Sequence, residues 1–295
     1  MSVSVQPIDP SRTDFAGRVS GVNIAANISP ATAAELEAAM DHYAVLVFHD
    51  QQISDEQQYQ FSEHFGAMES ATGDIARSGE RRLSMKMNDI SNLDQRGALM
   101  SRDDRRRLFG LGNMLWHSDS SFKTTPAKYS LLSAREIPDQ GGNTEFADMR
   151  KAWDTLDVER QRKSMHLVCE HSQLYSRGLL GFTDWNEEER QKNAPVKQRL
   201  VRRHTGSGRL SLYLASHAGS IDGWPVPEAR MFLRDLTEHA TQREFVYSHR
   251  WQCHDLVMWD NRAVMHRARD YDATQVRDMR RTTVTDVSST LEQPL

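Results

Sequence analysis

The residues best suited to chemistry by type and spacing are His117 and Asp119, in the segment Trp116-His117-Ser118-Asp119. If this segment is a β-strand, residues two positions apart point the same way, so both side chains can reach one metal ion. No other histidine in the chain is followed two positions later by Asp or Glu. The pair alone is not specific and needs a third ligand.

The best candidate for that third ligand is His266, which follows an apolar stretch, Leu256–Trp259, that predicts a buried strand. Two histidines and one carboxylate leave three metal positions open, which is typical of non-haem Fe(II) oxygenases. Zinc instead prefers four-coordinate sites. A simpler interpretation stays open, in which His117 and His266 are hydrogen-bonded histidines of the core.

Arginines that follow His266 favour the metal interpretation. Arg277 and Arg281 are four residues apart, so strand alternation places them on one face and Arg280 on the other. In a β-barrel, we expect their strand to return beside the strand of His266. A dicarboxylate that binds iron at one end needs a cation at the other, and arginine binds carboxylates bidentately. Thr144 could donate a hydroxyl to the same carboxylate. A basic strand end at the surface is the alternative.

Four motifs stand out along the chain, namely Trp116–Phe122, Gly141–Phe146, Trp259–His266 and Arg277–Arg281. In this order and with these spacings they resemble the Fe(II)/2-oxoglutarate-dependent dioxygenases of the TauD/TfdA group. The resemblance runs from about Val19 to Val284, and two stretches, Glu238–Tyr247 and Leu256–Arg262, look most like the 2,4-dichlorophenoxyacetate dioxygenase branch.

The resemblance implies which residues bind the cofactors, namely Fe(II) and the cosubstrates 2-oxoglutarate and O2. The residues that match the iron ligands, and with them the catalytic centre, are His117, Asp119 and His266. Those that match the 2-oxoglutarate site are Arg277 and Thr144 at the distal carboxylate, Asn113 near the metal-bound carboxylate, and Trp251, for which Trp259 is a competitor. Arg281 matches the arginine that binds the acidic group of the primary substrate.

The implied reaction is hydroxylation of the carbon next to the ether oxygen of an aryloxyacetate such as 2,4-dichlorophenoxyacetate, which gives a phenol, glyoxylate, succinate and CO2. Apolar loop side chains would surround the aryl ring, with Met85, Met87, Ile90 and Leu93 as candidates. Two alternatives stay open. One is a taurine-like sulfonate or alkyl sulfate dioxygenase, because Arg281 would bind either anion. The other is a non-catalytic jelly-roll metal-binding protein.

The elements that must position these residues are mostly short strands with a few helices. This mixture predicts an α+β, mostly β chain folded as a double-stranded β-helix, or jelly-roll, barrel. Helices are expected at 31–43, from Ser54 onward with a capping box to Gln57, at 149–156 and at 228–240. Strands are expected at 44–48, 128–132, 143–146, 165–170, 200–203, 210–214, 244–247, 256–259 and 282–284.

The segment at about 67–112 lacks clear periodicity, which is typical of either a lid over the active site or a solvated surface loop. In the family that the chain resembles, segments such as 67–112 and 173–197 cover the substrate pocket, so the resemblance implies that both are lids. No linker typical of a domain boundary separates the rest, so we predict one dioxygenase domain over residues 1–295.

The amino-acid composition limits the classes of molecule that the protein can bind. The net charge of −4 argues against a general nucleic-acid or anionic-membrane binder. The two cysteines fit a reducing compartment, and residues 1–19 lack the pattern of a signal peptide. We therefore expect a cytoplasmic protein that binds a small-molecule carboxylate, and the family likeness suggests a homo-oligomer. The 37 basic residues include 7 lysines and thus 30 arginines, an excess that we attribute mainly to composition bias.

Overall fold

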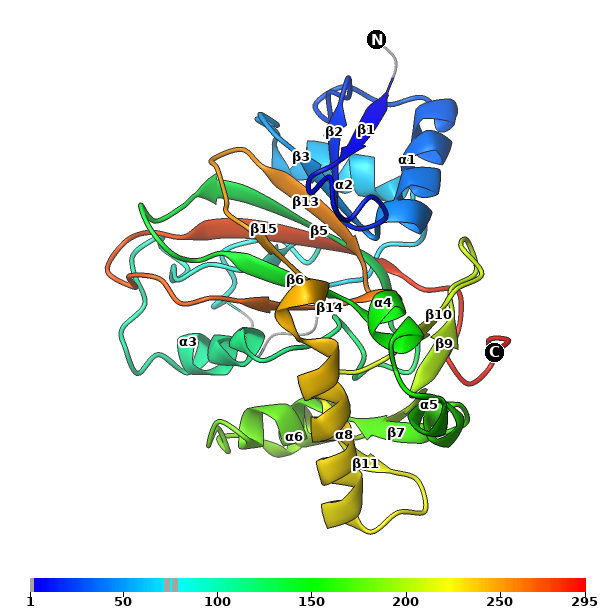
Figure 1. Cartoon of the computed structure of the whole chain (residues 1–295). Coiled ribbons are helices and arrows are strands. Elements are labelled where there is room, and N and C mark those ends of the chain that lie inside the picture. The colour runs from blue at the N-terminus through cyan, green and yellow to red at the C-terminus, as the bar shows by residue number, and fades with distance from the viewer. Residues whose placement is uncertain (1–2, 72–74, 76–78) are drawn as a thin grey trace.

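The largest element of the computed structural model, which describes residues 3–71, 75 and 79–295, is a seven-stranded sheet (Figure 1). Its strand order is β1-β2-β3-β13-β5-β15-β4, and only β2 and β3 run parallel to each other. Its strands are β1 (Ser4–Pro7), β2 (Gly17–Ser20), β3 (Val45–Phe48), β4 (Asn88–Asp89), β5 (Ala127–Glu136), β13 (Leu256–Asp260) and β15 (Asp278–Thr285).

Three smaller antiparallel sheets complete the β-structure of the described residues. The first, β12-β6-β14, comprises β6 (Thr144–Asp148), β12 (Val246–His249) and β14 (Val264–Ala268). The second, β11-β7-β8, comprises β7 (Val168–His171), β8 (Val196–Arg199) and β11 (Ala218–Ile221). The third is the hairpin of β9 (Val201–Arg203) and β10 (Leu210–Leu212).

The helices begin where capping residues predict. Ser29 accepts a hydrogen bond from the backbone N–H of Thr32 at the start of α1, and Ser54 forms a capping box with Gln57 in α2. The α-helices are α1 (Pro30–Tyr43), α2 (Asp55–Glu63), α3 (Arg105–Gly110), α4 (Met149–Asp154), α5 (Val158–Ser164), α6 (Gln173–Gly178), α7 (Glu187–Lys192) and α8 (Val226–Ala240), and the 3-10 helices are η1 (Leu111–Met114) and η2 (Arg243–Phe245).

Alternation along the central strand β13 divides the core into two layers. Leu256 and Met258 pack in one cluster with Leu36 of α1 and Phe61 of α2, so these helices cover one face of the seven-stranded sheet. Val257 and Trp259, which alternate with them along the strand, point to the opposite face.

The sheet β12-β6-β14 covers that opposite face (Figure 1). Phe146 of β6 and Val264 of β14 pack with Trp259 in one buried cluster between the two sheets. Their chain neighbours Ala147 and Met265 point outward and pack in a separate cluster with residues of α4 and α8. The order of layers is therefore helices, large sheet, small sheet and helices.

Most of the predicted elements are present. The predicted helices correspond to α1, α2, α4 and α8, and the strands predicted at 200–203 and 210–214 correspond to β9 and β10, which form a hairpin. The prediction of a strand at 244–247 is wrong in part, because 243–245 is 3-10 helix and the strand β12 begins at Val246. The expected strand at 165–170 likewise begins only at Val168, since α5 and its C-cap extend to Met165.

Two strand placements differ from expectation. His117 forms only an isolated bridge and Asp119 lies in a turn, so they do not share a regular strand. Arg281 lies on β15 of the seven-stranded sheet, whereas His266 lies on β14 of the facing sheet, so their strands are not neighbours. The fold is a mixed one with many strands, and within the described residues no helix is long and apolar enough to cross a membrane.

Candidate active site

His117 and His266 are paired through their backbones. The N–H of His117 donates to the carbonyl of His266 at 3.0 Å, and the N–H of His266 donates back at 2.8 Å. The chain then turns sharply after Asp119, because Ser120 adopts a left-handed conformation with φ of +54°. This bridge and this turn, rather than a strand, bring the three side chains together.

The three side chains converge on one point. Ligand atoms of His117, Asp119 and His266 all lie within 4.8 Å of one another, and all three residues are buried. The Nε2 atom of His117 is 3.8 Å from one carboxylate oxygen of Asp119, and the Nε2 atom of His266 is 3.7 Å from the other. The structure therefore brings together the three residues that the sequence predicts as metal ligands.

The protonation of this group suits a divalent cation. The Nδ1 atom of His117 lies 2.7 Å from the carbonyl oxygen of Leu115 and must donate to it, which leaves Nε2 as a lone-pair donor. Burial lowers the pKa of both histidines, that of His266 well below its usual range. Burial alone would raise the pKa of Asp119, but Arg281 and then the two histidines lower it to about 2. Two neutral imidazoles and one carboxylate result.

Asn261 holds the carboxylate of Asp119 in place. Its Oδ1 accepts hydrogen bonds from the backbone N–H of Asp119 at 3.0 Å and from Nε1 of Trp259 at 3.1 Å. Its Nδ2 donates at 3.0 Å to the hydroxyl of Ser130, which donates at 2.7 Å to Asp119 Oδ2. Asn261 is completely buried, so this support is shielded from water.

Arg281 and Arg280 point to opposite sides of β15, as alternation predicts. Arg281 lines the pocket and donates from Nη1 to Asp119 Oδ1 at 2.5 Å. Arg280 instead pairs with Asp55 at 2.8 Å and Asp278 at 3.0 Å. Arg280 is therefore structural, and Arg281 is part of the site.

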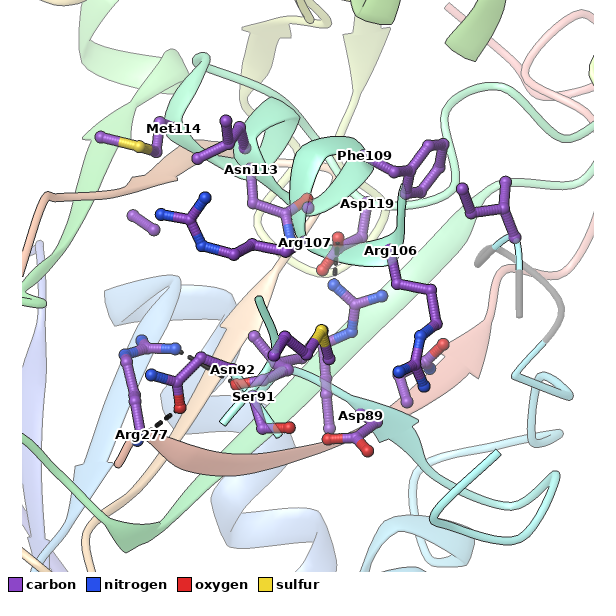
Figure 2. Close-up of a pocket in the computed structure, with 18 of the residues that line it drawn as sticks. Asp89, Ser91, Asn92, Arg106, Arg107, Phe109, Asn113, Met114, Asp119 and Arg277 are labelled. Carbon is purple, nitrogen blue, oxygen red and sulfur yellow. Dashed lines mark hydrogen bonds and ion pairs between the residues drawn. The ribbon is translucent and has the colours of Figure 1, made fainter. Parts of the chain in front are cut away.

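Arg277 is buried in the same pocket without a carboxylate partner in the part of the chain that the structure describes. Its Nη1 donates to the carbonyl oxygen of Ile90 at 3.2 Å, and its backbone N–H donates to Asn92 at 2.9 Å (Figure 2). Burial lowers the pKa of Arg277. A buried guanidinium of this kind is available to an acidic ligand.

The two candidate tryptophans differ in what they contact. Nε1 of Trp251 donates to the hydroxyl of Thr144 at 3.0 Å, and both residues are buried. The ring of Trp259 packs on His266 with ring centres 4.6 Å apart. Trp251 therefore contacts a candidate cosubstrate residue, and Trp259 contacts a candidate metal ligand. Thr144 does not itself line the pocket.

A cavity of about 230 Å³ is lined by His117 and Asp119, two of the three converging side chains. In Figure 2, Phe109, Asn113 and Met114 form one wall, and Asn92 and Arg277 form the opposite wall. Asn113 thus lines the site as predicted. Both predicted lid segments contribute to the lining, the first through most of its length and the second through Gln173 and Arg177.

Most of the apolar side chains that were predicted to line the pocket do not line it. Ile90 lines the pocket, but Met85 is 46% exposed outside it, and Met87 and Leu93 are buried elsewhere. Leu83 has the lining position nearest to Met85 in the chain. The 67–112 segment has no periodicity from which the inward positions could be assigned. Its apolar lining residues are Ile75, Leu83, Ile90, Met100, Phe109 and Leu111.

Arg177, a buried polar residue of the pocket, escaped the sequence reasoning as a site residue, and the buried His217 also lines the pocket. The ring of His217 lies 5.9 Å from that of His117. Arg177 belongs to the 173–197 segment, and its position in this predicted lid is the sequence feature that could have identified it as a site residue.

Comparisons with known proteins agree with this geometry. The family described as "Taurine catabolism dioxygenase TauD, TfdA family" matches residues 4–283. The chain is 44% identical over 286 residues, covering 97% of it and 99% of the relative, to an alpha-ketoglutarate-dependent 2,4-dichlorophenoxyacetate dioxygenase of Cupriavidus pinatubonensis. It is 35% identical, covering 92% of each chain, to the (S)-phenoxypropionate/alpha-ketoglutarate-dioxygenase of Sphingobium herbicidovorans.

Solved structures are similar over the whole chain. The crystal structure of AAD-2 in complex with Mn(II) and N-oxalylglycine has a TM-score of 0.95 and 54% identity, covering 98% of this chain and all of the other. A putative alpha-ketoglutarate dependent 2,4-D dioxygenase from Burkholderia xenovorans has a TM-score of 0.83 and 40% identity, covering 97% and 98%. The chain belongs to the TauD/TfdA family of dioxygenases.

Proposed function

We propose that the chain is an Fe(II)- and 2-oxoglutarate-dependent oxygenase that hydroxylates the carbon next to the ether oxygen of an aryloxyacetate such as 2,4-dichlorophenoxyacetate. The products are then a phenol, glyoxylate, succinate and CO2. The observation that carries the proposal is the buried group of His117, Asp119 and His266, of which His117 and Asp119 line a cavity together with several arginines. The likeness to 2,4-dichlorophenoxyacetate dioxygenases over nearly the full length supports the substrate class.

The three converging residues would hold the iron. They fit a divalent metal because their nitrogen and carboxylate ligands face one another while the Nδ1 atom of His117 is engaged by a carbonyl. Bound iron supplies the activation of O2 and the oxidation of the C–H bond. The contribution of Asp119 is a carboxylate kept charged by Arg281, and Asn261 keeps it oriented.

The cosubstrate 2-oxoglutarate would be bound by Arg277 and Thr144 at its distal carboxylate. Arg277 has no carboxylate partner within the described ranges, and Thr144 is oriented by the hydrogen bond from Trp251. Asn113 lines the cavity on the side where the metal-bound carboxylate would lie. These residues would orient the cosubstrate, and the burial of the site would exclude water.

The carboxylate of the primary substrate would be bound by Arg281. Only Nη1 of this guanidinium is engaged, by Asp119, and its Nε has no hydrogen-bond partner in the described part of the chain. Arginine presents five donors in a fixed fork, so an edge remains for a second carboxylate. Ile90 and Phe109 supply apolar lining for an aryl ring.

The experiment that tests the proposal is succinate formation with Fe(II), 2-oxoglutarate and a panel of organic acids. We expect succinate and a phenol from 2,4-dichlorophenoxyacetate, and none from the Asp119→Ala variant. Succinate coupled to taurine or an alkyl sulfate, but not to aryloxyacetates, would favour the sulfonate alternative. That alternative is supported by 26% identity to the alpha-ketoglutarate-dependent sulfate ester dioxygenase of Pseudomonas putida. No succinate with any acid would favour a non-catalytic metal-binding protein.

We also propose, from the family likeness, that the seven-stranded sheet and the sheet β12-β6-β14 form a double-stranded β-helix in one domain over residues 1–295. A cytoplasmic homo-oligomer without nucleic-acid or membrane partners is the accompanying proposal. Light scattering of the purified protein coupled to size exclusion tests the oligomeric state, and a mass of 33.8 kDa would contradict it.

A further inference from the structure

Arg177 is a buried cation that none of the roles above uses. It lies in α6, is only 3% exposed, and lines the same cavity as His117, Asp119 and Arg281. A short series of contacts connects it to the metal ligands. Its Nη1 is 3.4 Å from the hydroxyl of Ser176, which is 2.8 Å from Nδ1 of His217. The ring of His217 in turn lies 5.9 Å from that of His117.

The charge of Arg177 is not balanced by any carboxylate within residues 3–71, 75 and 79–295. Its hydrogen bonds are two long ones, to Ser176 and to Oδ1 of Asn113, each 3.4 Å. Its Nε atom is buried without a partner. Burial lowers the pKa of Arg177 to about 10, and the side chain is therefore still protonated at neutral pH. A buried charge without an opposite charge is costly, which indicates that an anion completes this site.

The surroundings of Arg177 are shaped for a guanidinium. Its Cζ atom lies 4.5 Å from the centre of the Phe109 ring, which stabilises a cation through the ring face. A Cβ atom on Gly112 would lie 2.2 Å from the same Cζ, so only glycine leaves room for the guanidinium. Gly112 and Phe109 come from η1 and α3, which form the wall opposite Arg277 in Figure 2.

Other arginines of the pocket differ from Arg177 because they pair with carboxylates. Arg82 pairs with Asp89 and Asp278, at 2.8 and 2.7 Å. Arg281 shares its charge with Asp119. Arg277 lacks a carboxylate partner too, but it has the role of binding 2-oxoglutarate in the proposal above. Arg107 also lines the pocket, but it is only half-buried and donates to the carbonyl oxygen of Arg102 at 2.7 Å. Arg177 is thus a fully buried pocket cation for which an anion is still to be named, and the primary substrate is the remaining anion of the reaction.

We propose that Arg177 binds the carboxylate of the aryloxyalkanoate primary substrate and thereby selects acids over neutral aryl ethers. The inference rests on the proposed function and adds a second guanidinium to Arg281. Arg177 lies in the predicted lid 173–197, so its contact with the substrate would hold this segment against the bound substrate. Its role is to bind and orient the substrate, and it touches the proposed 2-oxoglutarate site through the long hydrogen bond to Oδ1 of Asn113 at 3.4 Å.

The test measures binding without turnover. The enzyme is loaded with Mn(II) and N-oxalylglycine and titrated calorimetrically with 2,4-dichlorophenoxyacetate and with its neutral amide. We expect Arg177→Gln to raise the Kd for the acid about 10- to 100-fold, as for the loss of a charge-assisted hydrogen bond, and to leave the Kd for the amide within about 3-fold. Arg177→Lys keeps the charge but loses the fork, so we expect a smaller increase for the acid, about 3- to 10-fold.

Two controls separate binding from folding. Arg230→Gln removes an exposed arginine that stacks on Tyr175 of the same helix α6 at 4.7 Å, and it should leave both Kd values unchanged. The Kd for N-oxalylglycine should change by less than about 3-fold in Arg177→Gln, because the hydrogen bond from Arg177 to Asn113 is a long one, 3.4 Å. If this variant fails to bind N-oxalylglycine, circular dichroism tells whether it is misfolded, and the Arg177→Lys comparison of acid with amide decides.

The outcomes distinguish this inference from the proposed function. Equal Kd values for the acid in the wild type and both Arg177 variants would overturn the inference while the function stands. If the wild type binds neither aryloxyacetate nor its amide, the proposed substrate class is wrong. In that case the titration is repeated with the panel acid that yields succinate and with the neutral amide of that acid. An unchanged Kd for the acid in Arg177→Gln then overturns the inference. If no anion yields succinate, both proposals fall.

Discussion

Asn261 offers the sharpest test of how the carboxylate ligand is held. The substitution Asn261→Ala removes three buried hydrogen bonds, which involve Asp119, Trp259 and Ser130 at 3.0 to 3.1 Å. Each such bond contributes about 1 kcal/mol, and the two N–H donors left without an acceptor add to the cost. We expect the free energy of unfolding to fall by about 3 to 5 kcal/mol.

The same change should weaken metal binding. Without Asn261, the backbone of Asp119 loses its anchor and the Ser130 hydroxyl loses the donor that orients it. Loss of such supporting hydrogen bonds typically lowers metal affinity about 10- to 100-fold. We expect this loss in Mn(II) affinity, measured by chelator competition at a temperature where the variant is folded, as circular dichroism would show.

A matched control is Asn27→Ala. Asn27 is exposed and makes one hydrogen bond, to His64 at 3.2 Å. Its loss should change the free energy of unfolding by less than about 0.5 kcal/mol and leave the Mn(II) affinity unchanged. The reasoning is refuted if Asn261→Ala binds Mn(II) as tightly as Asn27→Ala does, because the hydrogen bonds to Asp119 would then not orient the ligand.

Three further predictions concern the pocket and its surroundings. His117→Ala, Asp119→Ala and His266→Ala should each abolish 2-oxoglutarate turnover and weaken Mn(II) binding, and ordinary turnover in any of them would contradict the ligand assignment. Arg277→Ala should mainly raise the KM for 2-oxoglutarate and Arg281→Ala mainly the KM for the organic acid, and a reversal of the two effects would show that the roles are exchanged. The third prediction concerns His171, where burial lowers the pKa to about 3. Because the unfolded chain binds the proton first, below pH 6.5, this residue should cost about 2 kcal/mol of stability between pH 7 and pH 5. His171→Gln should remove that part of the pH dependence of urea unfolding, and an identical slope in both proteins would contradict it.

The sequence predicted which three side chains converge, but not the backbone geometry that brings them together. The His-x-Asp spacing and the later histidine carry the ligand types, and the family likeness assigns them. The argument that His117 and Asp119 share a strand was nevertheless wrong, because an isolated bridge and a turn at Ser120 achieve the same convergence. Local spacing cannot reveal a turn whose left-handed residue is a serine, since glycine or asparagine is the usual signal.

Contacts between residues far apart in the chain explain which site residues could not be predicted from the sequence. Arg177 and Gly112 are far apart in the chain, and neither carries a periodic pattern that would bring them together. The six-residue helix α6 is too short for a reliable amphipathic signal. The large elements α1, α8 and β13 were predictable because their caps or apolar stretches are local properties.

The backbone bridge between His117 and His266 has a consequence for how the enzyme matures. The two halves of the bridge are about 150 residues apart, and at about 5 to 20 residues per second a ribosome needs roughly 7 to 30 s to synthesise the chain between them. During that interval His117 and Asp119 have no opposite strand and no third ligand. A nascent chain therefore cannot capture its metal by this site, and we expect loading only after β14 has been translated and docked.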